Sequence, residues 1–257
     1  MTNTVGKCVL VIPCYNEAKR LPADVIEEFA RTQPSIHILL VNDGSTDNTL
    51  QILNGLSGVE VLHCEKNGGK AEAVRQGMLQ ALKSNDAAVV GFWDADMATP
   101  LEASLELLDI LSTHPEIRMV FGARVKLLGR GIERNPLRHY LGRCFATAVS
   151  TVLQMPIYDT QCGAKLFRAD DRLRKVLDEP FISRWIFDVE ILARYIQMDG
   201  GDPARLAESI YEYPLKVWRD IAGSKVRPGD FIKAFTELFA IHFRYRKPGT
   251  ARMFTLQ

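Results

Sequence analysis

The sequence predicts an α/β protein with a mostly parallel central sheet and helices on both faces. Short apolar runs and segments of helical periodicity alternate four or five times within about the first 125 residues, and this alternation is typical of βαβ units. Several runs are uncharged and rich in Val, Ile and Leu, as strands are when helices cover both faces of a sheet. Polar and acidic residues follow the runs, where open parallel sheets bind their ligands.

The elements of this alternating part can be placed from periodicity and turn residues. The predicted strands cover residues 7–12, 36–42, 59–63, 87–93 and 119–123. The predicted helices cover residues 21–32, a segment that ends at 56, 71–83 and 101–113. Ser45, Thr46 and Asp47 are each good N-caps for the second of these helices. A late edge strand, interrupted by Pro214, is predicted at 211–219.

The strand at 87–93 is the one around which a site can be built. Its apolar run ends on Asp94 and Asp96, two carboxylates one residue apart. We expect both side chains at the carboxyl end of a buried strand, because the run before them carries no charge. Oxygen ligands of this kind suit Mg²⁺ or Mn²⁺ held together with substrate phosphates. A solvated loop with two acids is the alternative, and the pair alone does not decide between them.

Polar residues also follow the neighbouring strands. Asp43 ends one of them, and Arg124 directly follows another. The turn Gly68-Gly69-Lys70 precedes a predicted helix, and the N–H groups and dipole at such a helix start attract phosphate. Its spacing matches neither a Walker loop nor a dinucleotide-binding fingerprint. A plain turn is therefore the favoured interpretation, and a phosphate site is the alternative.

The second half of the chain has a different pattern. Residues 126–138 are rich in basic residues and glycine, and the predicted helix at 140–155 is apolar with Arg143 near its start. The last predicted helix, at 229–245, carries a stripe of aromatic residues and ends in basic ones. Each of these helices is either a core helix or an interfacial helix whose basic end faces lipid phosphates. The sequence leaves both interpretations open.

Composition limits the classes of partner and compartment. The 257 residues are 47% apolar, which is enough for a large core. The chain has 32 basic and 31 acidic residues, so we expect no nucleic-acid partner. The five cysteines are odd in number and lack metal-binding spacing. With no signal core and no run of about 18 apolar residues, we expect a cytoplasmic protein, with peripheral contact at the cytoplasmic membrane face as an alternative.

The order of short motifs resembles that of a known enzyme family. Four motifs resemble glycosyltransferase family 2, namely V-I-P-C-Y-N-E (11–17), N-D-G-S-T-D (42–47), K-N-G-G-K (66–70) and D-A-D (94–96). Three later motifs resemble the dolichyl-phosphate glucosyltransferase and mannosyltransferase branch, namely D-T-Q-C-G-A-K-L-F (159–167), W-I-F-D-V-E (185–190) and G-S-K (223–225). The resemblance covers roughly residues 7–230.

This resemblance implies a fold, a reaction and its substrates. It implies a GT-A fold, a nucleotide-diphosphate sugar donor such as UDP-glucose or GDP-mannose, Mg²⁺ or Mn²⁺, and inverting transfer of the hexose to a polyprenyl phosphate. We expect one GT-A domain over residues 1–257. Its nucleotide-sugar half would span about 1–125 and its acceptor half about 126–230, with an amphipathic helix and tail at 231–257.

The resemblance also assigns roles to individual residues. The nucleoside pocket would be lined by Pro13, Tyr15, Asn16, Glu17 and Asp43. Lys70 would lie close to the donor, Asp94 would hold the ribose or the metal, and Asp96 would be the metal ligand. We choose as phosphate contacts Arg124, Arg138 and Lys225, and as residues framing the sugar Gln161, Trp185 and Asp188. The catalytic candidates are Asp96, Asp188 and Lys225.

Two departures from the family pattern bear on substrate identity. Asn42 stands where the family commonly has an acid, and Ala164 stands where Phe is usual. The first change removes a charge beside the nucleotide, and the second opens space near the acceptor. Two other functions stay open, a transferase of the same fold with a soluble glycan or protein acceptor and a non-catalytic sugar-nucleotide sensor. The opening loop of a nucleotidyltransferase, rich in glycine, lysine and arginine, is missing.

Overall fold

The computed structural model describes residues 6–83, 86–133, 136–221 and 228–245, with the backbone alone at 136–139 and 228–232. Its strands are β1 (Lys7–Cys14), β2 (Ile36–Asp43), β3 (Val59–Cys64), β4 (Ala87–Trp93), β5 (Met119–Ala123), β6 (Gly131–Glu133), β7 (Ala164–Arg168), β8 (Ile210–Pro214) and β9 (Val217–Arg219). Its helices are α1 (Ala23–Thr32), α2 (Thr49–Gly55), α3 (Lys70–Lys83), α4 (Ala103–Thr113), α5 (Pro136–Leu153), α6 (Asp171–Asp178), α7 (Phe187–Met198), α8 (Pro203–Ala207) and α9 (Pro228–Tyr245). The predicted strands and helices of the first 123 residues are all present.

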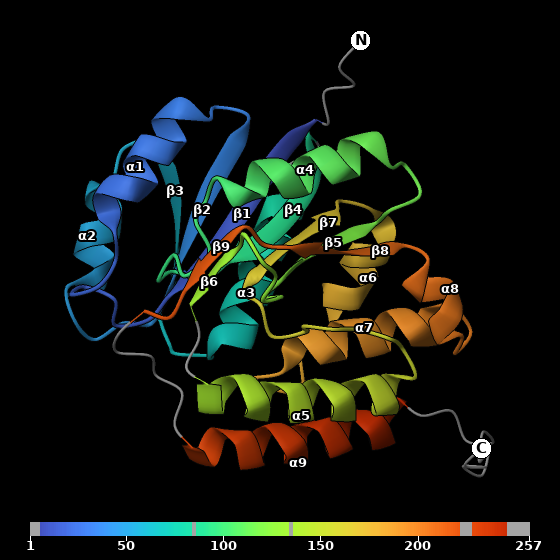
Figure 1. The fold of residues 1–257 in the computed structure, drawn as a ribbon. Helices are drawn as coiled ribbons and strands as arrows, with labels where there is room; N and C mark the ends of the chain where they lie inside the picture. The colour runs from blue at the N-terminus through green and yellow to red at the C-terminus, as the bar shows by residue number, and fades with distance from the viewer. Residues whose placement is uncertain (1–5, 84–85, 134–135, 222–227, 246–257) are drawn as a thin grey trace, which may run out of the picture.

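The main sheet has seven strands in the order β3-β2-β1-β4-β7-β5-β8 (Figure 1). Four of its six neighbouring pairs are parallel, which confirms the predicted sheet. The exception is β7, which runs antiparallel between β4 and β5 and places Ala164 opposite Trp93. An antiparallel strand begins where its neighbour ends. The residues that precede β7 therefore lie beside Asp94, at the end of β4.

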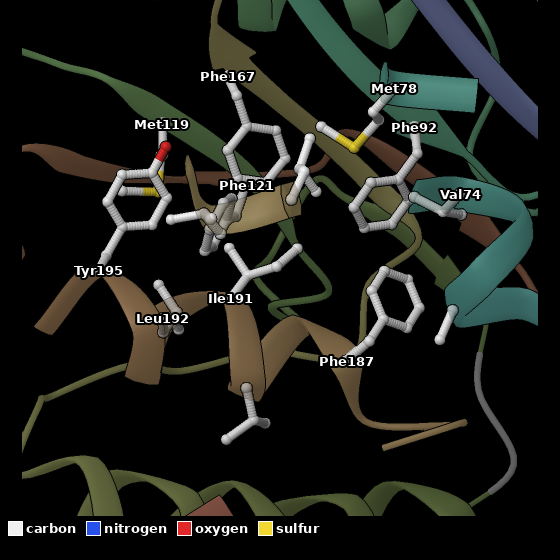
Figure 2. Close-up of a cluster of buried hydrophobic side chains, with 14 of the residues drawn as sticks. Val74, Met78, Phe92, Met119, Phe121, Phe167, Phe187, Ile191, Leu192 and Tyr195 are labelled. Atoms are coloured by element: carbon white, nitrogen blue, oxygen red, sulfur yellow. The ribbon is translucent and has the colours of Figure 1, made fainter. Parts of the chain in front are cut away.

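Helices cover both faces of the sheet, as predicted. Buried side chains of α1, α2 and α4 pack on one face, and those of α3, α6 and α7 pack on the other. Figure 2 shows the second core, where Phe92, Phe121 and Phe167 of the sheet meet Phe187 and Ile191 of α7. The rings of Phe92 and Phe187 lie 5.3 Å apart. This contact fixes the first turn of α7 against the central strand.

The helices α5 and α9 lie side by side beyond α7 and are the farthest from the sheet in Figure 1. Their inner sides belong to the core, with Val149 and Leu238 buried. Their outer sides expose aromatic rings, with Tyr140 69%, Phe239 59% and Phe243 74% accessible. The core interpretation is therefore confirmed for one side of each helix, and the exposed apolar side leaves the interfacial interpretation a prediction.

Two local predictions were right in part. The edge strand β8 ends at Pro214, where the interruption was predicted, but β9 pairs with β6 instead of continuing the main sheet. The N-cap position of α2 is Asn48, which makes no side-chain capping bond, but the predicted cap Asp47 accepts the Thr49 N–H at 3.0 Å. Ser45 instead accepts a hydrogen bond from the Asn16 N–H at 3.0 Å. Along the described residues, none of the helices combines the length and the apolar character needed to span a bilayer.

Candidate functional site

A cavity of about 780 Å³ opens at the carboxyl ends of β1, β2 and β4 and extends to α5 and α9. The predicted site residues that line it are Pro13, Tyr15, Glu17, Asp43, Lys70, Asp94, Asp96, Arg124, Gln161, Trp185 and Asp188. Residues far apart in the sequence are thus gathered where an open α/β sheet binds its ligand. The cavity is large enough for a cofactor-sized molecule.

The turn after β1 forms one end of the cavity. Tyr15 is partly exposed at this end, and the buried Glu17 carboxylate binds Arg20 through two contacts of 2.6 and 2.8 Å. Asn16 does not line the cavity. It has a φ of 51°, which asparagine tolerates, and its Oδ1 accepts the Thr46 N–H at 2.8 Å. Asn16 therefore ties the turn after β1 to the turn after β2.

Asp43 organises the glycine turn at the start of α3. Its carboxylate accepts the N–H groups of Gly68 at 2.8 Å and Gly69 at 2.9 Å and the side-chain amide of Asn67 at 2.9 Å. Only 3% of Asp43 is exposed. The N–H groups that the sequence suggested for a phosphate are thus donated to a carboxylate of the protein. The turn is therefore the plain structural turn that the sequence favours, and it builds a wall of the cavity.

Asp94 is fixed by a lysine and by a glycine. Its Oδ1 lies 2.5 Å from Lys70 Nζ, and its N–H donates to the Gly163 carbonyl at 2.9 Å. A Cβ on Gly163 would lie 1.9 Å from Asp94 Oδ2, so the close approach requires glycine. Burial raises the pKa of Asp94, but Lys70 outweighs it and holds that pKa below its usual value. Asp94 is therefore ionised and already paired.

Among the described residues, Asp96 differs from Asp94 in that it forms no ion pair with a basic side chain. Its Oδ1 accepts the Ala98 N–H at 3.1 Å, and burial together with the charge of Asp94 raises its pKa. An added cation would relieve both effects. In the part of the chain that the structure describes, no three His, Cys, Asp or Glu side chains are grouped so that they could hold a metal ion by themselves. The donor set fits a hard divalent cation that takes its remaining oxygen ligands from phosphates and water.

The loop before β7 is held by side chains from elsewhere in the chain. Arg124 binds the Asp159 carboxylate through two contacts of 2.7 Å and lies 5.3 Å from the centre of the Trp218 ring. Glu212 of β8 accepts the N–H groups of Tyr158 and Asp159, each at 2.8 Å. These contacts position Gln161 at the cavity wall, and they commit much of the Arg124 guanidinium to Asp159.

Asp188 faces the cavity from the first turn of α7. It is 7% exposed, and its Oδ1 lies 3.3 Å from Lys165 Nζ. Burial raises the pKa of Asp188 in spite of Lys165 and Lys70. Glu190, two residues later, points elsewhere and accepts the Ser183 N–H at 2.9 Å. Of these two acids, Asp188 therefore lines the cavity and Glu190 does not.

Several cavity residues had no role assigned from the sequence. They include Arg20, Arg143, Arg184, Trp218, Lys233 and Glu237. Arg143 had a signal only as the basic start of an apolar helix, and the others carried none. The side chain of Arg138 and all of Lys225, chosen as phosphate contacts, lie outside what the structure describes.

Two of these arginines lack an acidic partner. Arg143 donates to the Tyr158 carbonyl at 2.9 Å and stacks 3.8 Å from the centre of its ring. The Nε of Arg184 lies 3.7 Å from the point where a Cβ on Gly69 would stand. Among the described residues, neither guanidinium has a carboxylate within 4 Å. This part of the cavity therefore presents two positive charges that no described carboxylate pairs with.

Comparison with known sequences identifies related proteins. The family profile described as Glycosyl transferase family 2 matches residues 9–173. The dolichyl-phosphate beta-glucosyltransferase of Trichomonas vaginalis is 32% identical over 254 residues, which cover 91% of this chain and 71% of the relative. Proteins of the same name from Dictyostelium discoideum and Saccharomyces cerevisiae are 31% and 30% identical over 92% of this chain and 74% of each relative.

Solved structures share the fold. Glucosyl-3-phosphoglycerate synthase from Mycobacterium tuberculosis, in complex with Mn²⁺, uridine-diphosphate-glucose and phosphoglyceric acid, superposes with a TM-score of 0.66. The sequence identity is 18%, and the match covers 95% of this chain and 82% of that chain. At this identity the likeness establishes the fold, which is the GT-A fold expected from the motifs.

Proposed function

This chain belongs to glycosyltransferase family 2, and on that premise we propose that it transfers a hexose, with inversion, from a nucleotide-diphosphate sugar to a polyprenyl phosphate. The motifs predicted the family, and the profile match over residues 9–173 bears this out. Relatives named dolichyl-phosphate beta-glucosyltransferase support glucose as the hexose and dolichyl phosphate as the type of acceptor. UDP-glucose is the favoured donor because a structure of the same fold was solved with it, and GDP-mannose is the alternative.

The placement of the cavity walls supports a donor-binding part and an acceptor-binding part within one domain. Residues of about 1–125 would bind the nucleotide sugar, about 126–230 would bind the acceptor, and 231–257 would form the amphipathic helix and tail. The turns after β1 and β2 form one end of the cavity, and α5, α7 and α9 form the other. Pairing of β4 with β7 joins the two halves in a single sheet.

A divalent cation would complete the donor site. Mg²⁺ or Mn²⁺ would be held by Asp96, with Asp94 beside it, and the presence of Mn²⁺ in a structure of the same fold supports this choice. When bound, the cation would stabilise the charge that develops on the departing diphosphate. Lys70 would add a fixed positive charge at the same place, because Asp94 holds its ammonium at the cavity wall.

The observation that carries the acceptor assignment is the uncompensated charge of Arg143 and Arg184. An anionic acceptor would supply the missing negative charge, whereas a neutral sugar hydroxyl would not. The apolar side chains of Phe145, Ala146 and Ala234 line the cavity in the same region, on α5 and α9. A phosphate joined to an apolar chain matches this combination of arginines and apolar walls.

The transfer itself requires positioning more than proton movement. An oxygen of the acceptor phosphate would attack the anomeric carbon of the hexose while the bond from that carbon to the diphosphate breaks. A phosphate monoester is already anionic near neutral pH, since its second pKa is about 6, so no side chain must remove a proton. Trp185 and Asp188 would hold the sugar in line for the attack. With a hydroxyl acceptor, Asp188 would instead have to act as the base.

The exposed aromatic rings of α9 would bring the site to a membrane surface, where such an acceptor resides. Phe239 and Phe243 are exposed on the side of α9 opposite the core. Amphipathic helices with exposed aromatic residues and basic ends lie in the membrane interface, and Arg244 follows Phe243 directly. We place the protein as a peripheral enzyme at the cytoplasmic face of a membrane.

A thermal-shift panel tests the donor assignment. Nucleotide sugars and nucleoside diphosphates are compared with Mn²⁺, with Mg²⁺ and with a chelator. A ligand at 100 times its Kd stabilises the native state by about 2.7 kcal/mol, which is a readily measured shift. We expect the largest shift with a UDP-hexose and metal. Equal melting temperatures with every nucleotide sugar would refute the donor assignment.

Liposome flotation tests the acceptor and separates it from the rival functions. We expect the protein to float with vesicles that carry polyprenyl phosphate and to float less when Phe239 and Phe243 are both replaced by Ser. Equal flotation with plain vesicles would indicate lipid contact without acceptor recognition. No flotation, with turnover of a soluble glycan or protein, would favour the same-fold transferase with a soluble acceptor. Donor binding without any turnover would favour a sensor.

A further inference from the structure

Glu237 binds the backbone of the loop that leads into α7. Its Oε1 accepts the Arg184 N–H, and its Oε2 accepts the N–H groups of Trp185 and Ile186, each at 3.2 Å. Glu237 lies on α9, more than fifty residues away along the chain. One carboxylate thus binds three consecutive N–H groups of a loop that is neither helix nor strand. The last of the three, on Ile186, is at the N-cap position of α7, and the other two precede the helix.

The contact lies just before the first turn of α7, which has no side-chain cap of its own. Ile186 occupies the N-cap position of α7 and provides no side-chain capping bond. A negative charge near the first turn of a helix is stabilising, and here it is supplied by Glu237 of another helix. The preceding N–H groups of the loop, at Ile182 and Ser183, are accepted by Glu190 of α7 itself. The loop is therefore held on one side by α7 and on the other by α9.

The residues fixed in this way form a wall of the cavity. Arg184 and Trp185 line it, and Asp188 faces it one turn further on. At the other end of the cavity, Asp43 ends β2, and its carboxylate bonds to Asn67, Gly68 and Gly69 rather than to this loop. A change at Glu237 would thus act on one end of the cavity and spare the other.

The helix that carries Glu237 is itself well anchored. Tyr245 Oη donates to Glu190 at 2.8 Å, and Arg194 Nε donates to the same hydroxyl at 3.0 Å. On α5, the ring of Phe145 meets Phe235 edge to face, with centres 5.5 Å apart. The position of α9 against α5 and α7 is therefore defined at several points. Glu237 links the loop to this well-positioned helix.

We propose that Glu237 is a positioning residue for the hexose, acting through the placement of Trp185 and Asp188. The proposal rests on the proposed function for the identity of the hexose, but the loop contact does not depend on which acceptor is used. A purely structural glutamate would affect folding and all ligands alike. A positioning glutamate affects the sugar and leaves the nucleotide largely unaffected.

The test compares Glu237→Gln and Glu237→Ala with wild type and with the control Thr236→Ala. Thr236 is the preceding residue of α9, is exposed, and bonds only within the helix at Lys233. For each protein we would measure the Kd for UDP, the Kd for UDP-glucose, both with Mn²⁺, and the melting temperature. The change in tryptophan fluorescence caused by UDP-glucose beyond that caused by UDP would report on Trp185. A Trp185→Phe protein identifies that contribution.

We expect the Kd for UDP to stay within about threefold in both variants. The extra affinity gained from the glucose should fall about tenfold in Glu237→Ala, which loses all three hydrogen bonds, and less in Glu237→Gln, which keeps one acceptor oxygen. The sugar-dependent fluorescence change should fall in parallel, and Thr236→Ala should match wild type. Wild-type sugar affinity in a folded Glu237→Ala protein would overturn the proposal, as would equal losses for UDP and UDP-glucose.

These measurements do not require an acceptor. If no polyprenyl phosphate is turned over while the glucose increment still depends on Glu237, the proposed function fails and the positioning role stands. If transfer occurs at the wild-type rate in Glu237→Ala, the positioning role fails and the proposed function stands.

Discussion

The two ends of the cavity are built in different ways. At the proposed nucleoside end, side chains such as Asp43 and Asp94 stand at the ends of β2 and β4, the parallel strands on either side of β1, so the sheet itself sets their positions. At the hexose and acceptor end, Gln161 and Trp185 lie on loops without regular structure. Glu212 and Glu237 hold those two loops by their N–H groups. The first end is positioned by backbone pairing, and the second by single long-range side-chain contacts.

This difference has an energetic consequence. A sheet residue is held by many cooperative backbone hydrogen bonds, and the loss of one side chain leaves the scaffold in place. A loop held by only one or two carboxylates depends on each of them, because each buried N–H group left without a partner costs about 1–3 kcal/mol. We therefore expect a substitution at the nucleoside end to remove the function of one side chain while the scaffold stays in place. A substitution at the other end should move the residues that hold the substrate.

The largest effect is expected at the metal ligand. Asp96→Ala should lower metal-dependent turnover of the donor by about 1,000-fold or more, because it removes several kcal/mol of stabilisation of the leaving diphosphate. The fold should be unaffected, since Asp96 stands at a strand end. Single-turnover assays with and without a chelator measure the effect. An enzyme indifferent to both the chelator and the substitution would refute the metal assignment.

A smaller loss is expected at Asp188, on the positioned side. Asp188→Asn should reduce transfer by about 100-fold through misplacement of the sugar, with UDP affinity preserved. The rate should still rise with pH near 6 in the variant, because that rise belongs to the acceptor phosphate. Burial raises the pKa of Asp188, so a general base would make the wild-type rate rise through that raised value. Loss of the rise in the Asn variant would favour a hydroxyl acceptor.

Gly163→Ala tests the point where the two ends meet. The new Cβ would lie 1.9 Å from Asp94 Oδ2, so the carboxylate must move away from Lys70. We expect a loss of about 1–3 kcal/mol in the free energy of unfolding and a fall in donor turnover. Gly55→Ala is the matched control, because nothing lies within 4 Å of its Cβ position. Equal behaviour of the two alanine variants in denaturant titration would contradict the contact.

The smallest effect is expected for a loop contact that touches no substrate. Glu212→Gln should lower the free energy of unfolding by about 1–2 kcal/mol, since one oxygen that accepts the Tyr158 and Asp159 N–H groups is replaced by an amide donor. UDP affinity should stay as in wild type, and acceptor KM should rise. Calorimetry and steady-state kinetics measure both. A change confined to UDP affinity would contradict the proposal that the two ends of the cavity are positioned independently.

The two ends of the cavity also differ in how well they could be predicted from the sequence. The strands of the first half, and Asp43, Asp94 and Asp96 at their ends, were predictable because an apolar run that stops at an acid marks a strand terminus. The glycine turn could be predicted as a turn, but the sequence does not reveal that Asp43 fixes it by accepting the Gly68 N–H.

The second half was less predictable for a physical reason. Arg143, Arg184 and Glu237 lie on helices or loops whose local patterns describe only amphipathic or irregular segments. Their roles arise from contacts between elements far apart in the sequence, which periodicity cannot report. Through their resemblance to a family, the motifs at 159–167 and 185–190 indicated that these segments belong to the site. They did not show which contacts hold the loops.

The transfer reaction is the most direct test of the central claim. Purified protein, Mn²⁺ and UDP-glucose labelled in the glucose would be incubated with a polyprenyl phosphate, or with the corresponding polyprenol, in detergent. The account predicts a labelled lipid with the phosphate acceptor alone, and no labelled lipid from Asp96→Ala. Label in the polyprenol, or in a soluble glycan but never in the phosphate lipid, would contradict it.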